Sequence, residues 1–139
     1  MSQENIQLMR QAAAAEPAWR LLGIELVEIS EGFARVRLRV KPEFCNFVGT
    51  IHGGIIMTLA DSAFGYAVNS VKHPTVAAQF NTHFLNPCEP GDELEAECQV
   101  IKAGKRAVMA EIRVATSYGK VIARATGTGI PLVEGKEPI

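Results

Sequence analysis

The segment NFVGTIHGGIIMTLADSAFGYAVNS, residues 46–70, contains the most continuous apolar run of the chain. Positions 53–68 of this run favour a helix of roughly 24 Å. Apolar side chains cover most of its circumference, so the helix is predicted to be buried nearly all round. Other elements must therefore wrap around it. Asp61 is the one acidic residue inside the segment, and a carboxylate in so apolar a helix needs a reason.

Strand patterns lie on both sides of this helix. Residues 23–29 and 33–40 alternate apolar and polar side chains around a Ser-Glu-Gly turn, which predicts a β-hairpin. Four further strand patterns follow at residues 75–87, 92–103, 106–117 and 120–133. The turns between the last three are too short for parallel crossovers. The sequence therefore predicts an α+β fold in which five or six antiparallel strands curl around one long helix.

Length and composition indicate one globular domain spanning residues 1–139. Hydrophobic residues make up 47% of the chain and charged residues 21%, which is ordinary for a folded protein. Residues 1–22 are Ala-rich and predict a helical N-terminal segment, and residues 133–139 predict a frayed charged tail.

Several classes of protein are disfavoured. The net charge is −1, so no bulk field attracts nucleic acid or an anionic membrane. No apolar run is long enough to span a bilayer, and no secretory leader is visible, so we expect a cytoplasmic protein. The three cysteines form no CxxC pair, and His73 and His83 stand apart. We therefore expect no disulfide framework, no metal and no cofactor.

The helix and the loop before it carry a specific motif. Its residues are Asn46, Gly49, His52, Gly53, Gly54, Leu59, Ala60 and Asp61. With the surrounding strand order, this motif resembles that of the hot-dog-fold acyl-CoA thioesterases of the PaaI-like (phenylacetic acid degradation) family, over residues 21–132. The resemblance implies a sheet wrapped around a central helix, paired subunits that often assemble further into homotetramers, and active sites at the dimer interface.

The same resemblance implies roles for individual residues. Asp61 would be the catalytic carboxylate, facing a His-Gly-Gly that belongs to the partner subunit. Gly53 would offer its backbone N–H to the thioester carbonyl, while Asn46 and His52 would shape the loop around it. Some relatives place a Ser or Thr that positions water where this chain has Ala77. Thr75 and Gln79 are the weak substitutes.

The residue pattern supports this chemistry independently. Gly53 and Gly54 lie where a loop enters a helix, and the first N–H groups of a helix lack intrahelical acceptors and can bind an oxyanion. Asp61 lies about 12 Å further along the helix, too far to share one carbonyl with Gly53 of the same chain. Two antiparallel helices related by a two-fold axis would bring the two groups together. Asp61 would act as general base or as nucleophile, and the direction of its pKa shift stays open.

Substrate-binding residues are harder to assign from sequence. Lys102, Lys105 and Arg106 cluster in one turn and could meet the phosphates of coenzyme A, although solvated turn charge is the simpler interpretation. The arginines at positions 35, 37 and 39 are a second candidate. The acyl pocket would be lined by Phe47, Met57, Phe64 and Tyr66, with Gly54 beside the thioester, although such apolar residues are more often core.

Hydrolysis of a medium-chain or aromatic acyl-CoA is the function that this pattern favours. An enoyl-CoA hydratase of the same fold is disfavoured because Asp61 follows His52 by nine residues rather than closely. A non-catalytic acyl-CoA sensor is the alternative from another class. It would carry a DNA-binding segment, and no basic arm or helix-turn-helix pattern is visible.

Overall fold

A computed structural model describes residues 2–132 of the chain. Its elements are α1 (Ser2–Ala15), α2 (Pro17–Leu22), β1 (Glu25–Ser30), β2 (Phe33–Arg39), the short 3-10 helix η1 (Pro42–Phe44), α3 (Gly53–Val71), β3 (Thr75–Phe84), β4 (Glu93–Ala103), β5 (Val108–Thr116) and β6 (Val121–Pro131). The predicted N-terminal helices and all six strands are confirmed. The predicted tail at 133–139 lies outside the described residues.

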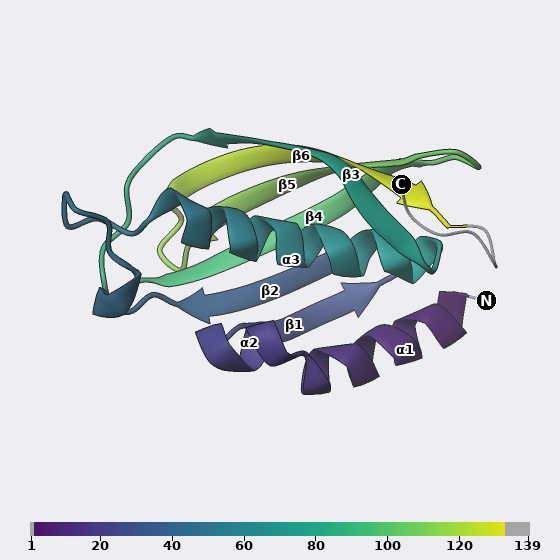
Figure 1. Cartoon of the computed structure of the whole chain (residues 1–139), viewed down its shortest axis with the longest axis horizontal. Helices are drawn as coiled ribbons and strands as arrows, with labels where there is room; N and C mark the ends of the chain where they lie inside the picture. Colours follow the sequence, from purple (N-terminus) through teal and green to yellow (C-terminus); the bar gives the residue numbers. More distant parts are fainter. Residues whose placement is uncertain (1, 133–139) are drawn as a thin grey trace.

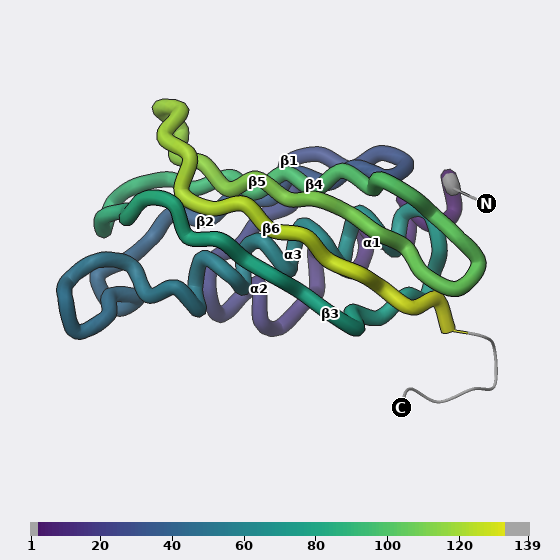
Figure 2. The backbone as a smooth tube through the Cα atoms, turned by 90° about the horizontal axis from the view of Figure 1, so that it is seen from above, coloured from purple at the N-terminus to yellow at the C-terminus, as the bar shows by residue number. Residues whose placement is uncertain are grey.

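The strands form one antiparallel sheet in the order β1-β2-β4-β5-β6-β3. Figure 1 shows this sheet curling around α3, with α1 and α2 beside the lower strands. Figure 2, seen from above, places the three helices on one side of the sheet. The α+β prediction of strands wrapped around one long helix is confirmed.

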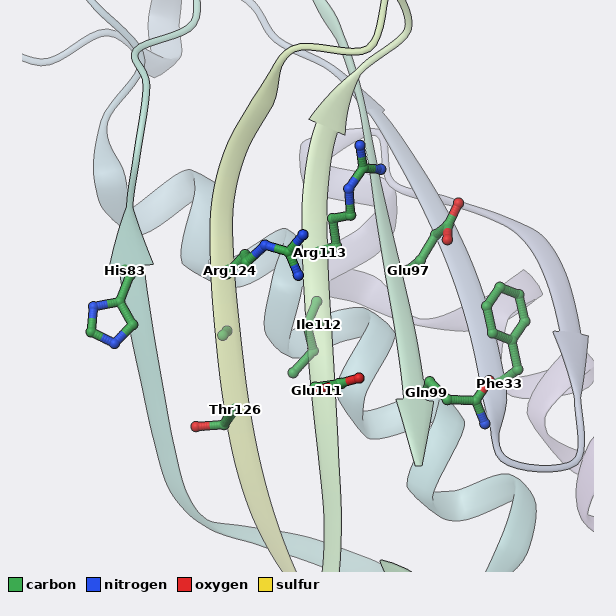
Figure 3. A pocket seen from close by; sticks show the side chains of 10 residues that line it. Phe33, His83, Glu97, Gln99, Glu111, Ile112, Arg113, Arg124 and Thr126 are labelled. Carbon is green, nitrogen blue, oxygen red and sulfur yellow. The ribbon is translucent and has the colours of Figure 1, made fainter. Parts of the chain in front are cut away.

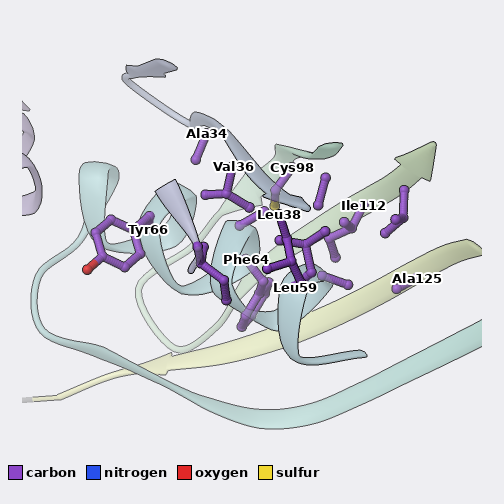
Figure 4. Close-up of a cluster of buried hydrophobic side chains, with 14 of the residues drawn as sticks. Ala34, Val36, Leu38, Leu59, Phe64, Tyr66, Cys98, Ile112 and Ala125 are labelled. Carbon is purple, nitrogen blue, oxygen red and sulfur yellow. The ribbon is translucent and has the colours of Figure 1, made fainter. Parts of the chain in front are cut away.

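The core forms where the inner face of the sheet meets α3 (Figure 4). Leu59 and Phe64 on the helix are 0% and 1% exposed. Burying a side chain of this size contributes about 1.5–3 kcal/mol. The Phe64 ring uses space that β6 leaves free, because a Cβ built at Gly127 would lie 2.6 Å from that ring. The helix is thereby held at a fixed rotation against the sheet.

Helix α3 ends at Val71, three residues later than predicted. The polar residues near its end are satisfied locally, which is why the helix tolerates them. The Asn69 amide donates to the backbone oxygens of Gly65 and Thr75 at 2.8 and 3.0 Å. The Ser70 hydroxyl donates to Ala67 O at 2.6 Å and accepts from the Gly32 N–H at 2.9 Å.

One stripe of α3 is not covered, which differs from the expectation of burial nearly all round. Gly54, Met57 and Asp61 are exposed, at spacings of three and four residues that place them on one side of the helix. The sheet covers the opposite side, and α1 and α2 cover only part of the rest. A single chain therefore leaves a stripe uncovered that carries one apolar side chain, Met57, and one carboxylate, Asp61.

The two edge strands of the sheet differ in character. Edge strand β1 carries Glu25 and Glu28, which pair with arginines on β2. Edge strand β3 has the sequence TVAAQFNTHF, without a lysine, arginine or carboxylate, and most of it is exposed. Charged residues are a common means of preventing an edge from pairing with another strand. By this criterion β1 is protected and β3 is open.

Candidate active site

Asn46 organises the loop that leads into α3. Its side-chain oxygen accepts hydrogen bonds from the backbone N–H groups of Val48, Gly49 and Thr50 at 2.9, 3.0 and 3.2 Å. Its amide nitrogen donates to the Thr50 hydroxyl at 3.1 Å. Gly49 has φ +102°, a left-handed conformation that favours glycine. Within this chain Asn46 therefore shapes the loop.

His52 caps the N-terminus of α3. Its ring Nδ1 accepts the Gly54 N–H at 2.9 Å, so in the neutral imidazole the proton resides on Nε2. A Cβ built at Gly54 would lie 3.1 Å from this Nδ1, so glycine leaves room for the imidazole ring. His52 thus holds the first turn of the helix and presents an Nε2–H donor beside it.

Gly53 is left with an available N–H. Among residues 2–132 no hydrogen bond engages this group, whereas the Gly54 N–H is taken by His52. The Gly53 N–H also sits at the positive end of the helix dipole. The Phe84 ring, at the end of β3, packs against Gly53, since a Cβ built there would lie 3.2 Å from it. One backbone donor is therefore free at the mouth of the helix.

Asp61 borders two cavities on the free side of α3. One, of about 360 Å³, is lined by Gly54, Met57 and Thr58 of α3 and by Phe80 of β3. The other, of about 410 Å³, lies between α1 and α3 and continues to the start of β3. Its lining residues are Met9, Ala12, Glu16, Asp61, Ser62, Gly65, Tyr66, Asn69, His73, Pro74 and Thr75. Asp61 stands where the two cavities approach each other.

The wall of the larger cavity brings a second carboxylate toward Asp61. The Tyr66 hydroxyl donates to Glu16 Oε1 at 2.8 Å, across the junction between α1 and α2. Although Asp61 is exposed in the single chain, the cavity walls partly desolvate its carboxyl group, and this desolvation together with repulsion from Glu16 raises the pKa of Asp61. In the single chain the pKa of Asp61 is therefore shifted upward. An acid with a raised pKa inside a cavity is a candidate functional group.

The predicted acyl-pocket residues are dispersed. Phe47 lies at the tip of the loop and is fully exposed, and Met57 lies on the free stripe of α3 at 39% exposure. Phe64 is in the core and lines neither cavity beside Asp61. Tyr66 lines the larger cavity next to Glu16, to which its hydroxyl donates a hydrogen bond. Met57 thus lines the smaller cavity with Asp61, Tyr66 lines the larger cavity with Asp61, and Phe64 lines neither.

Sequence reasoning missed the contribution of the N-terminal segment. Met9, Ala12 and Glu16 line the larger cavity, although nothing in their local pattern distinguishes them from surface helix residues. Gly65 was also missed. A glycine inside a helix is unfavourable by about 1 kcal/mol relative to alanine, and this cost was the available signal.

Of the proposed water-positioning groups, Thr75 lines the cavity, but its hydroxyl donates to Lys72 O.

The basic turn of Lys102, Lys105 and Arg106 lies at the opposite end of the sheet from Gly53 of the same chain. It joins β4 to β5, and Val108 at the start of β5 pairs with Gly129, which pairs in turn with Ala77 near the start of β3. Phe84, which contacts Gly53, is at the other end of β3. These three residues could meet a substrate bound at Gly53 only if that glycine belonged to another chain.

The arginines at positions 35, 37 and 39 are engaged in ion pairs. Arg35 contacts Glu28 at 2.7 Å and Glu97 at 3.1 Å. Arg37 contacts Glu25 at 3.5 Å, and Arg39 contacts Glu93 at 3.7 Å. This arrangement supports the interpretation of a solvated outer sheet face rather than a ligand site.

A third cavity, of about 380 Å³, lies on that outer face (Figure 3). Arg113 and Arg124 pair directly across β5 and β6, and His83 pairs with Arg124 from β3. These side chains lie on the side of the sheet away from α3, so they do not contribute to the Asp61 site.

Other classes of site find no support in the part of the chain that the structure describes. No group of three or more His, Cys, Asp or Glu side chains could hold a metal ion among residues 2–132. The cysteines at positions 45, 88 and 98 are free thiols. None of the described helices has the length and apolar character that crossing a membrane requires.

Comparison with known proteins defines the class. The family model of the Thioesterase superfamily matches residues 48–123, which include the Gly53 and Asp61 helix. The chain belongs to this superfamily. The six-stranded antiparallel sheet around α3 is its hot-dog fold, and the resemblance to PaaI-like thioesterases seen in the sequence motif is confirmed.

Individual relatives are similar over most of the chain. Acyl-coenzyme A thioesterase PaaI of Escherichia coli is 36% identical over 108 residues, covering 78% of this chain and 77% of that protein. The solved structure of the E. coli PaaI protein covers 95% of this chain and 94% of its own with a TM-score of 0.86. Human acyl-coenzyme A thioesterase 13 is 27% identical and covers 92% of this chain and 94% of that protein. A Streptococcus mutans protein bound to acetyl CoA is 25% identical, with a TM-score of 0.77 and coverage of 81% and 91%.

Proposed function

We propose that this protein hydrolyses acyl-CoA thioesters, releasing the free acid and coenzyme A, with Asp61 of one chain acting opposite the Gly53 N–H of a second copy. The observation that carries the proposal is the arrangement on α3. A free backbone donor lies at the N-terminus of the helix, and a carboxylate of raised pKa lies on its uncovered stripe. The names of the relatives supply the substrate class, acyl-coenzyme A.

The need for a second copy follows from distance. Gly53 and Asp61 are eight residues apart on one helix, or about 12 Å. A carbonyl within hydrogen-bonding distance of Gly53 would be out of reach of Asp61 in the same chain. Two copies of α3 packed antiparallel about a two-fold axis place each Asp61 beside the other Gly53.

Two surface features support this pairing. The open edge of β3 can add a second β3 and continue the sheet into the other copy. The uncovered stripe of α3 lies next to that edge, since Phe80 of β3 and Met57 of α3 line one cavity. One two-fold contact would therefore pair the strands and cover the stripe. Further assembly of such dimers into homotetramers is compatible with this contact.

The chemistry assigns a task to each group. The Gly53 N–H, at the positive end of the helix dipole, stabilises the negative charge that develops on the thioester oxygen. The ionised Asp61 either removes a proton from the attacking water or attacks the carbonyl carbon itself, and the coenzyme A thiolate leaves in both routes. His52 keeps the first turn in place and offers Nε2–H to the substrate, while Asn46 holds the loop.

The larger cavity is the natural place for the acyl group. Its volume of about 410 Å³ suits a medium-chain or aromatic acyl group rather than an acetyl group alone. It begins at Asp61 and follows α3 to Asn69, with Met9 and Ala12 of α1 as the outer wall. Lys102, Lys105 and Arg106 of the chain that supplies Asp61 would then face the coenzyme A phosphates.

The proposal is tested by thiol release from short-chain, medium-chain and aromatic acyl-CoA thioesters. Asp61→Asn should lower kcat/KM on the order of 10²- to 10⁴-fold, because the amide neither accepts a proton at neutral pH nor attacks the carbonyl. Asp92→Asn is the matched control, since Asp92 is the other aspartate of the chain and lies in the turn before β4. It should retain wild-type rates.

Two results would contradict the proposal. Equal rates in wild type and Asp61→Asn would remove the carboxylate from the mechanism. Tight binding of acyl-CoA by the wild type without any thiol release would identify a binding module instead of a hydrolase.

A further inference from the structure

Glu16 lies at the junction of α1 and α2. It is the N-cap residue of α2, and its side chain makes no cap hydrogen bond. The carboxylate instead turns to α3 and accepts from the Tyr66 hydroxyl at 2.8 Å. It thereby lines the cavity that Asp61 also lines.

The surrounding contacts fix this carboxylate in place. The Trp19 ring stacks on Tyr66 with centroids 4.4 Å apart. Its Nε1–H donates to the Ser62 hydroxyl at 3.2 Å, and Ser62 directly follows Asp61 in α3. Trp19 is 2% exposed and Tyr66 is 7% exposed. The start of α2 is thus docked onto the turn of α3 that carries the catalytic carboxylate.

The charges facing Asp61 are few. From the α1–α2 junction comes Glu16, and from α3 itself comes the neutral Tyr66. His73, between α3 and β3, lies at the far end of the cavity with Nδ1 2.8 Å from Asn69 Oδ1. Neither cavity beside Asp61 has a lysine or arginine among its described lining residues. In the proposed dimer His52 of the second copy would be the remaining titratable neighbour.

Building on the proposed function, we propose that Glu16 is a positioning residue of the Asp61 site, which acts through the Asp61 carboxylate and raises the lower pH limit of hydrolysis. Its negative charge, held by Tyr66 at the wall of the shared cavity, disfavours a second negative charge on Asp61. The repulsion from Glu16 acts in the same direction as the partial burial of Asp61. A carboxylate that holds its proton more tightly is a stronger base once ionised, so the arrangement favours proton removal from water near neutral pH.

The sign of the pH effect follows directly. Asp61 must be ionised to act, so kcat/KM falls as the pH drops through the raised pKa of Asp61. Glu16→Gln removes the repelling charge and keeps an oxygen that can accept from Tyr66. The acid limb of the kcat/KM profile, which reports the free enzyme, should move to lower pH by on the order of half a pH unit.

Two further variants separate charge from structure. Glu16→Asp retains the charge, so its acid limb should stay close to that of the wild type. Glu4→Gln removes the same charge from the exposed first turn of α1, away from the cavity, and should leave the profile unchanged. Titration of the Asp61 carboxyl carbon by NMR in wild type and Glu16→Gln should show the same displacement as the kinetics.

An acid limb in Glu16→Gln that overlays that of the wild type would overturn the inference, as would a loss of rate by one factor at every pH. Both results leave the proposed function intact, provided that the wild type hydrolyses acyl-CoA and Asp61→Asn does not. Failure of the wild type to hydrolyse any acyl-CoA would instead overturn the proposed function.

Discussion

At the start of α3, two neighbouring backbone N–H groups differ in whether they make a hydrogen bond. The Gly54 N–H is taken by the His52 ring, whereas the Gly53 N–H is engaged by no hydrogen bond among the described residues. Glycine leaves room at both positions, because an added Cβ would lie 3.1 Å from the His52 ring at position 54 and 3.2 Å from the Phe84 ring at position 53. The cap therefore leaves one of the two donors unengaged at the start of the helix.

This difference can be tested by removing the Gly53 donor alone. Gly53 is the first residue of the helix, where proline is tolerated because its missing N–H has no intrahelical partner. Gly53→Pro should fold and should lower kcat about 10²- to 10³-fold, the usual effect of losing an oxyanion donor. Gly53→Ala keeps the N–H and also contacts Phe84, so it controls for steric effects.

Circular dichroism and thermal unfolding should show both variants folded before their kinetics are compared. Equal activity in Gly53→Pro and Gly53→Ala would show that the oxyanion is stabilised elsewhere.

The long helix α3 combines a face buried against the sheet and the uncovered stripe that we propose to be functional. Leu59 and Phe64 anchor it to the sheet, while Asp61 and Gly65 border the larger cavity. Nothing outside the helix backbone lies within 4 Å of a Cβ built at Gly65. The glycine therefore adds depth to the cavity rather than relieving a steric clash.

Filling that space should change substrate selection. Gly65→Leu should lower kcat/KM about 10-fold or more for medium-chain and aromatic acyl-CoA, because a few methylenes in an apolar pocket discriminate by this amount. Acetyl-CoA, which does not extend along α3, should be affected far less. Gly65→Ala should stabilise the helix by up to about 1 kcal/mol and keep the selectivity near that of the wild type.

These values are checked by kinetics over a series of acyl lengths and by thermal unfolding. A uniform loss across all acyl lengths in Gly65→Leu would place the acyl group outside this cavity.

The strands and helices could be predicted from the period of their apolar residues, and Asp61, Gly53 and His52 from a motif with a chemical rationale. The wall of the cavity could not, because Met9, Ala12 and Glu16 join the site only through the packing of α1 and α2 on α3. Phe64 is the opposite case, a residue that the sequence places in the acyl pocket and the structure places in the core against Gly127. An aromatic residue near the motif suggests a pocket, but its ring fills the space above a glycine on β6.

For the whole molecule, the single chain is incomplete in two places. The edge of β3 has unpaired backbone groups without charged protection, and the stripe of α3 from Gly54 to Asp61 is uncovered. Both lie on the same side of the fold and are joined by one cavity. In the proposed dimer, a second copy covers both features, and each active site is made from two chains.

Complementation of two inactive variants tests this claim most directly. Asp61→Asn and Gly53→Pro chains are co-expressed with different tags, and the mixed dimer is isolated. One of its two sites then combines an intact Asp61 with an intact Gly53, so the mixed dimer should recover about half of the wild-type activity per dimer. Mixed dimers as inactive as the two parent variants would contradict a site shared between chains.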